Sequence, residues 1–305
     1  MWLVYALLCT LFWGFADLFY KKGADETKKY THLKTAIMVG LVMGVHAIYL
    51  LIFENLNYNP LNLIMYLPVS AMYILSMILG YFGLRYLELS VSSPIQNSSG
   101  AIVCILCILF LGQALDLISI VSVFLICLGI FLLGIFEKKK QNDIDKKYKI
   151  GFIAFMMPIF YCVLDAAGTF FDAFYLDDLS TTPLIGVTES TLENVACVSY
   201  ELTFLIIAII LLVFLKLFKK EKLELFTLKT TGTAAIFETL GQSVYVFAMS
   251  GNAAIAAPLI SAYSIISLIL SRIFLKEKLS KKHYISICLV MLGIILLGVA
   301  EGLVE

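Results

Sequence analysis

Charged residues are scarce in this sequence. Asp, Glu, Lys and Arg make up 14% of its 305 residues, whereas hydrophobic residues make up 61% and the mean hydropathy is +0.96. An average soluble domain has about 25% charged and about 45–50% apolar residues. So few polar residues cannot cover a water-facing surface, which excludes a cytosolic enzyme, a nucleic-acid-binding protein and a disordered scaffold. The composition instead predicts an all-α, polytopic membrane protein, because lipid requires each span to satisfy its own backbone hydrogen bonds.

Several functional motifs are also missing. The chain contains no G-x-G-D, no H-E-x-x-H and no G-x-S-x-G, so we expect no enzyme activity. Its seven cysteines lie in or beside apolar runs, and the C-x-x-C of Cys104 and Cys107 falls inside one of them. Cysteine in such a helix packs as a small hydrophobe, so we expect no metal and no cofactor. The N-terminus lacks the basic region and cleavage site of a signal peptide, which predicts that the first apolar run is retained as a span.

Ten apolar runs approach the roughly 20 residues that a membrane-spanning helix needs. With ten spans, all 22 Lys and Arg residues fall on one face of the membrane. Lys and Arg favour the cytoplasmic face, which places both termini outside a bacterial inner (plasma) membrane. The predicted spans are approximately 2–20, 35–53, 62–84, 93–112, 115–136, 150–172, 194–215, 230–250, 253–275 and 284–303.

The sequence contains an internal repeat. Residues 94–137 match residues 258–301 at a shift of 164 positions without gaps, with 16 of 44 positions identical. The matches include Pro94 with Pro258 and Gly129 with Gly293. Apolar bias alone does not readily align prolines and glycines in one register, so we interpret the match as a duplication.

The duplication predicts two five-helix repeats, at 1–137 and 150–305, joined by a cytoplasmic hinge loop at 138–149. Because five is an odd number, the second repeat would enter the membrane from the opposite side, which makes an inverted repeat. Two inverted halves can open a central site to each face in turn. The alternative is a duplicated packing unit without a transport role.

Four further features together resemble a known family. The first span contains Phe12-Trp13-Gly14, a proline opens spans 4 and 9, and F-L-K-E-K-L (274–279) and L-G-I-x-L-L-G (292–298) flank and fill the last span. This combination resembles the drug/metabolite transporter superfamily, EamA type. The resemblance implies an inner-membrane carrier with a central cavity between its two halves.

Two aspartates inside spans are the first site candidates, since a charge in the membrane is costly and tends to be functional or paired. Asp17 and Asp165 correspond at a shift of 148, and each follows an aromatic residue by four positions, Trp13 and Tyr161. A carboxylate and a ring on one helix face can hold a cation by charge and cation–π attraction. The alternative for Asp17 is an interfacial ion pair with a lysine one turn later.

Other polar residues within spans complete the candidate site. Glu238 forms a polar stripe with residues four and seven positions later, and Glu201 lies in span 7. His46 would act as a proton relay or simply bond a neighbouring helix. A polar run follows Pro94, and lipid offers such groups no hydrogen bonds. The candidate substrate- and proton-binding residues are therefore Asp165, Glu238, Glu201, Asp17, Trp13, Tyr161, Gln96, Asn97, Gln242, Tyr245, Tyr263 and His46.

The sign of the charges indicates the substrate. The predicted membrane interior offers carboxylates but no Lys or Arg, which suits a small amine-bearing, zwitterionic or cationic metabolite, such as an amino acid or drug-like compound. A carboxyl group removed from water takes up a proton more readily, so we expect a proton-coupled, alternating-access transporter. Alternatives are a flippase for lipids or lipid-linked sugars with the same fold, or a non-transporting membrane subunit. The expected partners are the bilayer and a small-molecule substrate, not nucleic acid, and the chain would act as a monomer or homodimer.

Overall fold

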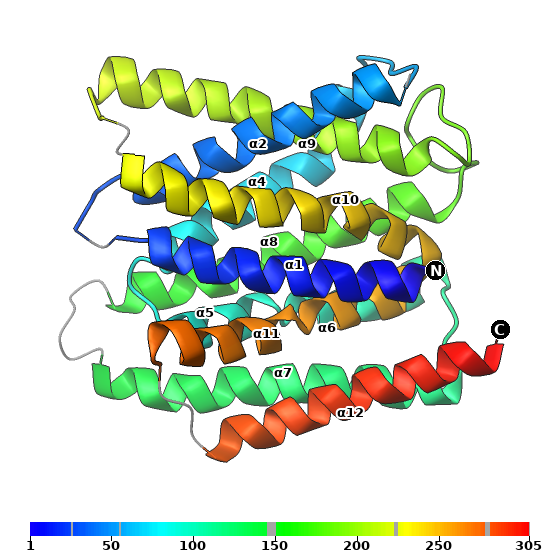
Figure 1. Cartoon of the computed structure of the whole chain (residues 1–305). Helices are drawn as coiled ribbons and strands as arrows, with labels where there is room; N and C mark the ends of the chain where they lie inside the picture. Colours follow the sequence, from blue (N-terminus) through cyan, green and yellow to red (C-terminus); the bar gives the residue numbers. More distant parts are fainter. Residues whose placement is uncertain (26, 55, 145–150, 223–224, 278–280, 305) are drawn as a thin grey trace.

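The computed structural model describes the chain except for residues 26, 55, 145–150, 223–224, 278–280 and 305. All regular elements in the described part are helical, and the long helices run side by side along one direction (Figure 1). The predicted all-α class is confirmed. The helices are α1 (Trp2–Gly23), α2 (Thr31–Phe53), α3 (Asn62–Met65), α4 (Leu67–Gly83), α5 (Leu89–Gln96), α6 (Ser99–Leu106), α7 (Leu117–Ile144), α8 (Gly151–Asp177), α9 (Leu192–Val213), α10 (Leu225–Ser261), α11 (Tyr263–Leu270) and α12 (Lys281–Val304).

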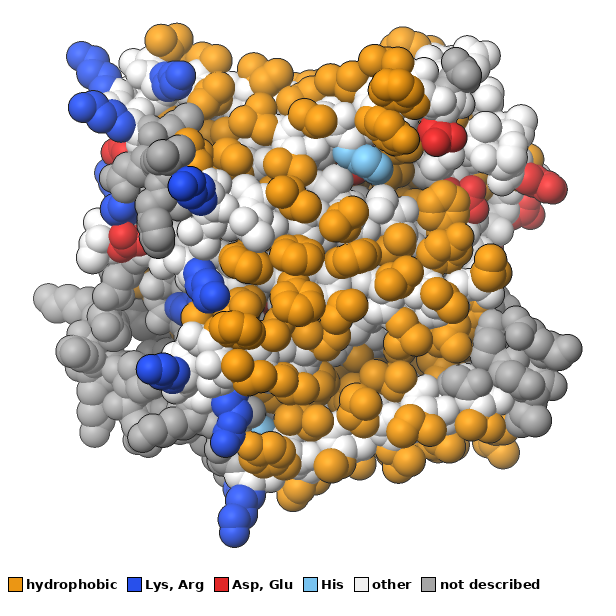
Figure 2. All heavy atoms as spheres, viewed as in Figure 1, with side chains coloured by type: hydrophobic (Ala, Val, Ile, Leu, Met, Phe, Trp, Pro, Cys, Tyr) orange, Lys and Arg blue, Asp and Glu red, His pale blue; other side chains and the backbone are white. Residues whose placement is uncertain are grey.

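The helices have the length and composition of membrane spans. Among the described residues, six helical stretches are long and apolar enough to cross a bilayer, and two shorter apolar helices cover Leu67–Gly83 and Leu117–Leu132. Large apolar side chains cover the face shown in Figure 2, whereas Lys and Arg gather at one end of the bundle. Both chain ends lie at the other end (Figure 1). This surface fits a polytopic membrane protein, because apolar side chains are stable against lipid.

One of the six stretches contains a reversal of the chain. It covers Leu228–Leu275, but the backbone leaves the helical region at Asn252, where φ is −160° and ψ is 95°. In Figure 1, α10 reaches one end of the bundle there, and the chain then returns through α11. The boundary predicted between two spans, at 250–253, lies next to this break.

Two helices are interrupted in the middle of the bundle, a few residues after a proline. α5 ends at Gln96 and α6 begins at Ser99, while α10 ends at Ser261 and α11 begins at Tyr263. Pro94 and Pro258 lie inside the helices that end there. Proline removes a backbone N–H and crowds the preceding turn, which accounts for a bend at both places.

The sequence match at a shift of 164 extends to backbone detail. The π-helical turns η1 (Cys107–Leu111) and η4 (Ser271–Leu275) occupy matching positions. Each is followed by a residue in the left-handed region, Gly112 with φ 66° and Lys276 with φ 59°. The backbone therefore repeats even where the side chain changes from glycine to lysine.

Packing between the matching segments is reciprocal. A Cβ atom on Gly129 would lie 2.9 Å from the carbonyl oxygen of Ser286, and one on Gly293 would lie 2.7 Å from that of Ser122. At the repeat shift of 164 positions, Gly129 corresponds to Gly293 and Ser122 to Ser286, so the two contacts are equivalent. Two surfaces that contact in this way are related by a two-fold axis, here between α7 and α12, and glycine permits their close approach.

The structure also bears on the expected hinge loop at 138–149. α7 continues to Ile144, so residues 138–144 are helical instead of forming a loop. The rest of that stretch lies outside the described residues.

Candidate functional site

A cavity lies in the middle of the bundle, where the two interrupted helices meet α1, α4 and α8. It has about 60 Å³ of space for the centres of water-sized molecules, whereas one water needs ~10–15 Å³ on this measure. The side chains lining it are mostly aromatic or polar. They are Trp13, Asp17, Tyr20, Tyr73, Met77, Gly80, Tyr81, Leu84, Gln96, Asn97, Ser99, Gly100, Val103, Tyr161, Asp165, Thr169, Tyr200, Glu238, Gln242, Tyr245, Ala257, Ile260, Ser261 and Tyr263.

Asp17 is held by hydroxyl groups from both interrupted helices. Its Oδ2 accepts hydrogen bonds from Ser93 and Ser267, each at 2.7 Å, and the residue is only 7% exposed. The nearby Lys21 donates instead to the carbonyl oxygens of Leu84 and Leu87, at 2.8 and 2.6 Å. Asp17 thus joins α1 to α5 and α11.

Asp165 has a more open position on α8. Its Oδ2 accepts a hydrogen bond from Ser99 at 2.7 Å, and Tyr161, one turn earlier, lines the same cavity. The residue remains partly exposed. A carboxylate offers about four lone-pair positions, so Asp165 can bind a further donor without losing Ser99.

Glu238 is the third carboxylate. Its Oε2 accepts a hydrogen bond from the Tyr20 hydroxyl at 3.1 Å, and its exposed fraction is 8%. None of the described residues lining the cavity is Lys or Arg. The negative charges of this site therefore face hydroxyl and aromatic groups, which stabilise them less than a cation would.

Aromatic rings form one wall of the cavity. The Trp13 ring lies 5.2 Å from that of Tyr245 and 5.7 Å from that of Tyr263. The Trp13 Nε1 group donates to the backbone oxygen of Glu238 at 3.3 Å. Trp13 and Tyr161 also have matching neighbours, because a Cβ on Gly241 would meet the Trp13 ring and a Cβ on Gly80 would meet the Tyr161 ring.

Buried tyrosines extend from the cavity toward the end of the bundle that carries the chain termini. The Tyr73 hydroxyl lies 2.7 Å from both the Thr169 and the Tyr245 hydroxyls. Beyond them, the Tyr66 hydroxyl donates to Asp172, which is 1% exposed. Sequence reasoning missed Asp172, although its spacing of seven residues from Asp165 puts both on one face of a helix.

His46 and Glu201 do not line the cavity. The His46 Nδ1 atom lies 2.8 Å from Glu201 Oε1, which joins α2 to α9. This contact agrees with the expectation that His46 hydrogen-bonds a neighbouring helix. The cavity gathers the other ten of the twelve candidates, and their binding of substrate or protons remains a prediction.

The cavity residues that sequence reasoning missed are mainly tyrosines. Tyr20, Tyr73, Tyr81 and Tyr200 line the cavity, but tyrosine in a span also occurs at lipid interfaces. The sequence shows tyrosines in the predicted spans, but it gives no indication of the helix face on which each one lies.

These features define the chain as a multi-pass helical membrane protein with a buried acidic cavity. The sequence profile of the EamA-like transporter family matches residues 1–135 and 191–299. The chain therefore belongs to the EamA-like transporter family, within the drug/metabolite transporter superfamily, as the resemblance implied.

Two further comparisons were informative. A solved structure titled "Crystal structure of protein" aligns with a TM-score of 0.67 at 11% identity, over 100% of this chain and 98% of that one. This similarity concerns the fold alone. No curated protein matches the sequence.

Proposed function

We propose that this transporter is a secondary carrier for a small amine-bearing, zwitterionic or cationic metabolite, such as an amino acid or a drug-like compound. The observation that carries the proposal is the cavity itself. Asp17, Asp165 and Glu238 line the same cavity, and no Lys or Arg occurs among its described lining residues. Burying uncompensated negative charge is costly, and a bound ammonium group would offset that cost.

The aromatic wall supports the same class of substrate. Trp13, Tyr161, Tyr245 and Tyr263 line the space that contains the carboxylates. A cation over such rings gains about 0.5–2 kcal/mol, and the ring edges and hydroxyls can hold the remainder of the molecule. A phosphorylated substrate would need cationic partners instead.

Proton coupling follows from the same charge balance. Without a cationic substrate, the carboxylates have hydroxyl partners only, so protons are the simplest means of neutralising them. Exchange of a proton for the ammonium group of the substrate would keep the cavity close to neutral throughout the cycle. Asp165 is the best-placed carboxylate for this exchange, because it is more exposed than Asp17 or Glu238 and its hydrogen-bond donors are the hydroxyls of Ser99 and Tyr161.

The carrier works by alternating access between two inverted five-helix repeats, 1–137 and 150–305. Support comes from the matching π-turns and left-handed residues, from the reciprocal contacts of α7 with α12, and from the break at Asn252. If the break separates two spans, the described apolar stretches number nine, and α12 (Lys281–Val304) is the tenth. The central helix interruptions resemble those that form substrate sites in other inverted-repeat transporters.

The orientation is also part of the proposal. Lys and Arg gather at one end of the bundle, and both termini lie at the other end (Figures 1 and 2). The charge asymmetry favours a cytoplasmic location for the Lys-rich end, in a bacterial inner membrane with both termini outside. A monomer suffices, since both repeats are in one chain, and a homodimer is compatible with this arrangement.

A lipid flippase of the same fold would need a polar groove open to the bilayer. Asp17 and Glu238 are 7% and 8% exposed, which favours a small soluble substrate over a lipid headgroup. A non-transporting subunit would have no use for a central cavity with three carboxylates.

The test begins with a thermal-shift screen of the purified protein against amines, amino acids and nucleosides at two pH values. Each compound that stabilises the protein is then assayed for uptake into proteoliposomes under an imposed proton gradient. Transport that is abolished in Asp165→Asn and Glu238→Gln, but retained in the control Cys288→Ser at an exposed cysteine, is the expected result. Normal transport and pH dependence in both carboxylate variants would overturn the proposal, and lipid scrambling in the same vesicles would favour the flippase.

A further inference from the structure

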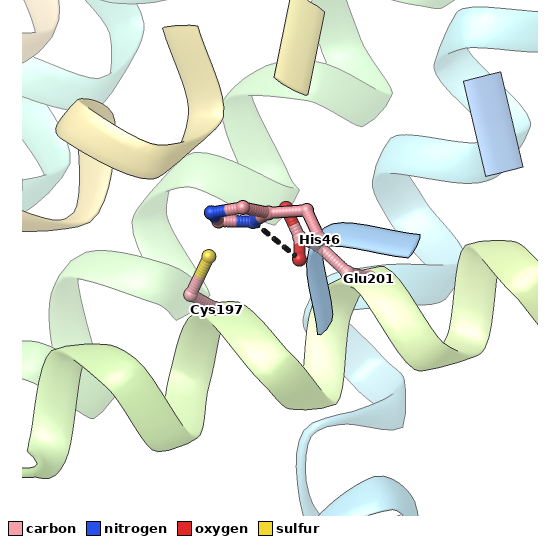
Figure 3. Close-up of side chains that lie close together, drawn as sticks. All are labelled: His46, Cys197 and Glu201. Carbon is pink, nitrogen blue, oxygen red and sulfur yellow. Dashed lines mark hydrogen bonds and ion pairs between the residues drawn. The ribbon is translucent and has the colours of Figure 1, made fainter. Parts of the chain in front are cut away.

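Three potential metal ligands meet between α2 and α9, away from the central cavity. Figure 3 shows His46 of α2 facing Cys197 and Glu201, which lie four residues apart on one face of α9. The His46 Nδ1 atom is 2.8 and 2.9 Å from the two Glu201 carboxylate oxygens. The ligand atoms of all three residues lie within 4.8 Å of one another.

We propose that His46, Cys197 and Glu201 bind a divalent transition-metal ion, with Zn²⁺ as the best fit. Thiolate, imidazole and carboxylate are the three side-chain ligands that Zn²⁺ takes, and a set of three leaves one position for water or another ligand. Hard cations such as Mg²⁺ and Ca²⁺ prefer oxygen ligands alone. The mixed set therefore selects a borderline ion of the first transition series.

The geometry requires only a small adjustment. Tetrahedral Zn²⁺ with bonds of about 2.0–2.3 Å holds its ligand atoms about 3.3–3.7 Å apart. The imidazole and carboxylate would separate by about half an ångström from their present hydrogen bond, and the thiol would approach by about 1 Å or less. A rotamer change or a slight movement of one side chain is sufficient, because Cys197 and Glu201 already share a helix face.

The surroundings favour an ion over a simple hydrogen bond. The Glu201 side chain is 0% exposed, and that of His46 is 26% exposed, so the carboxylate is buried while the imidazole reaches the surface of the bundle. Cys197 is 2% exposed, and its thiol makes a side-chain hydrogen bond with Glu201, which also binds His46. A buried carboxylate and thiol next to an imidazole can release protons when a cation replaces them.

The site has a mechanical consequence. An ion held by α2 and α9 would fix these two helices to each other more firmly than one hydrogen bond does.

This inference is independent of the proposed substrate, because none of the three residues lines the central cavity. Its failure would therefore leave the carrier proposal untouched, and the reverse also holds.

Titration of the chelator-treated, purified protein with Co²⁺ tests the site directly. Tetrahedral Co²⁺ absorbs visible light, and a bound thiolate adds a charge-transfer band in the near ultraviolet. We expect one Co²⁺ per chain with this band, its displacement by Zn²⁺, and proton release on binding. Zn²⁺ should also raise the unfolding temperature, since the three ligands come together only in the folded state and the ion binds that state more tightly.

The variants separate a metal site from a structural hydrogen bond. Cys197→Ser keeps the His46–Glu201 pair and should remove the charge-transfer band, while its unfolding temperature without metal stays near that of the wild type. His46→Ala should weaken Co²⁺ binding at least about 10–100-fold, as even outer-shell changes do. Cys162→Ser, at another buried cysteine, is the matched control and should bind as the wild type does. A wild type without the band, a band that survives Cys197→Ser, or its loss in Cys162→Ser would overturn the proposal.

Discussion

The segments 88–137 and 252–301 share a backbone but differ in chemistry. Both contain a proline, a helix interruption, a π-turn and a left-handed residue at matching positions. The first segment is nevertheless polar where the second is apolar. The matching pairs are Ser90 with Ala254, Ser92 with Ala256, Ser93 with Ala257 and Gln96 with Ile260. The backbone geometry of the duplicated unit thus persists while its side chains diverge, and one of the divergent pairs, Gln96 and Ile260, lines the cavity.

This divergence gives the two corresponding aspartates different surroundings. Asp17 accepts two short hydrogen bonds, from Ser93 of the polar segment and from Ser267 of the apolar one. Asp165 accepts a short hydrogen bond from Ser99 of α6, has its other donor, Tyr161, on its own helix, and remains partly exposed. We therefore propose that Asp165 binds the substrate and that Asp17 has a structural role, joining α1 to α5 and α11.

The largest expected effect is on ligand binding in Asp165→Asn. Loss of the charge that pairs with a buried ammonium group should weaken binding by about 2–5 kcal/mol, or roughly 30-fold or more. Asp17→Asn should weaken binding less but lower the unfolding temperature more, because its two serine donors lose a charged acceptor. Both effects can be measured by titrating the amine found in the screen during thermal unfolding.

Ser99→Ala is the control for this pair, since it removes the hydrogen bond to Asp165 but keeps the charge. It should retain most of the affinity that Asp165→Asn loses. If Asp17→Asn reduces affinity as strongly as Asp165→Asn does, the two aspartates are functionally equivalent, and the proposed division of roles is wrong.

The second prediction concerns the crossing of α7 and α12, where the two segments are most alike. Gly129→Ala and Gly293→Ala should each destabilise the protein by about 1–3 kcal/mol, as other overpacking substitutions do, because the new Cβ would meet a carbonyl oxygen within 3 Å. Their effects should be similar, since the contacts are reciprocal. Chemical denaturation in detergent measures both.

Gly232→Ala in α10 is the matched control, because its Cβ would meet only the flexible end of Met38 at 3.3 Å. Alanine is favoured over glycine within a helix by about 0.5–1 kcal/mol, so this variant should be neutral or slightly stabilising. Strongly unequal effects of Gly129→Ala and Gly293→Ala would show that the two-fold relation does not extend to energetics.

Much of the helical layout could be predicted, because hydrophobic length and helical period are local properties. The boundary near 250–253 is an example, as α10 breaks at Asn252. The same reasoning placed Tyr161 and Asp165 on one face of a helix, and both line the cavity. The repeat predicted that the two proline-containing spans correspond, and their interruptions do match.

Contacts between distant helices could not be predicted. The partners of Asp17 lie 76 and 250 positions away in the sequence, and no local pattern selects them. Asp172 was missed because the sixth span was predicted to end there, whereas α8 continues to Asp177. His46 and Glu201 were expected in the site but lie outside the cavity. Hydropathy could not exclude them, because it does not show which side of a uniformly apolar helix faces inward.

The third prediction compares two loop residues that accept hydrogen bonds from the backbone. Glu277 accepts from the amides of Leu89 and Ser90, at 3.1 and 3.0 Å. The matching Gln113 accepts from the amide of Ala254 at 2.9 Å. Glu277→Ala should cost about 1–2 kcal/mol and Gln113→Ala about 0.5–1 kcal/mol. The first leaves two helix-start amides without a charged acceptor, whereas the second leaves one amide without a neutral acceptor and removes an exposed hydrogen bond to Asp177.

Glu277→Gln sharpens this comparison, since it makes the two loops alike. It should retain about half of the stability that Glu277→Ala loses, as the amide oxygen can still accept a bond from one of the two N–H groups. Thermal unfolding of the three variants gives the order directly, and an equal loss in both alanine variants would contradict it.

The smallest effect concerns the start of α7, where the two segments differ in a titratable group. Asp116 accepts hydrogen bonds from the Ser119 hydroxyl at 2.5 Å and from the Ile118 and Ser119 amides at 2.8 and 3.0 Å. The Ser119 hydrogen bond, aided by these amides, lowers the pKa of Asp116 below its ordinary value. A carboxyl group whose pKa is lower in the folded chain stabilises the fold above its unfolded pKa of about 3.9, and this contribution is lost as the pH falls through the folded pKa.

Asp116→Ser copies Ser280, the residue at the matching position of the sequence, which cannot titrate in this range. The unfolding temperature of the wild type should exceed that of the variant by a constant amount between about pH 5 and 8, and the difference should shrink below about pH 4. Other carboxylates are common to both proteins, so their titration cancels in the difference. A gap that persists unchanged at about pH 3 would mean that Asp116 stabilises α7 through its shape and not its charge.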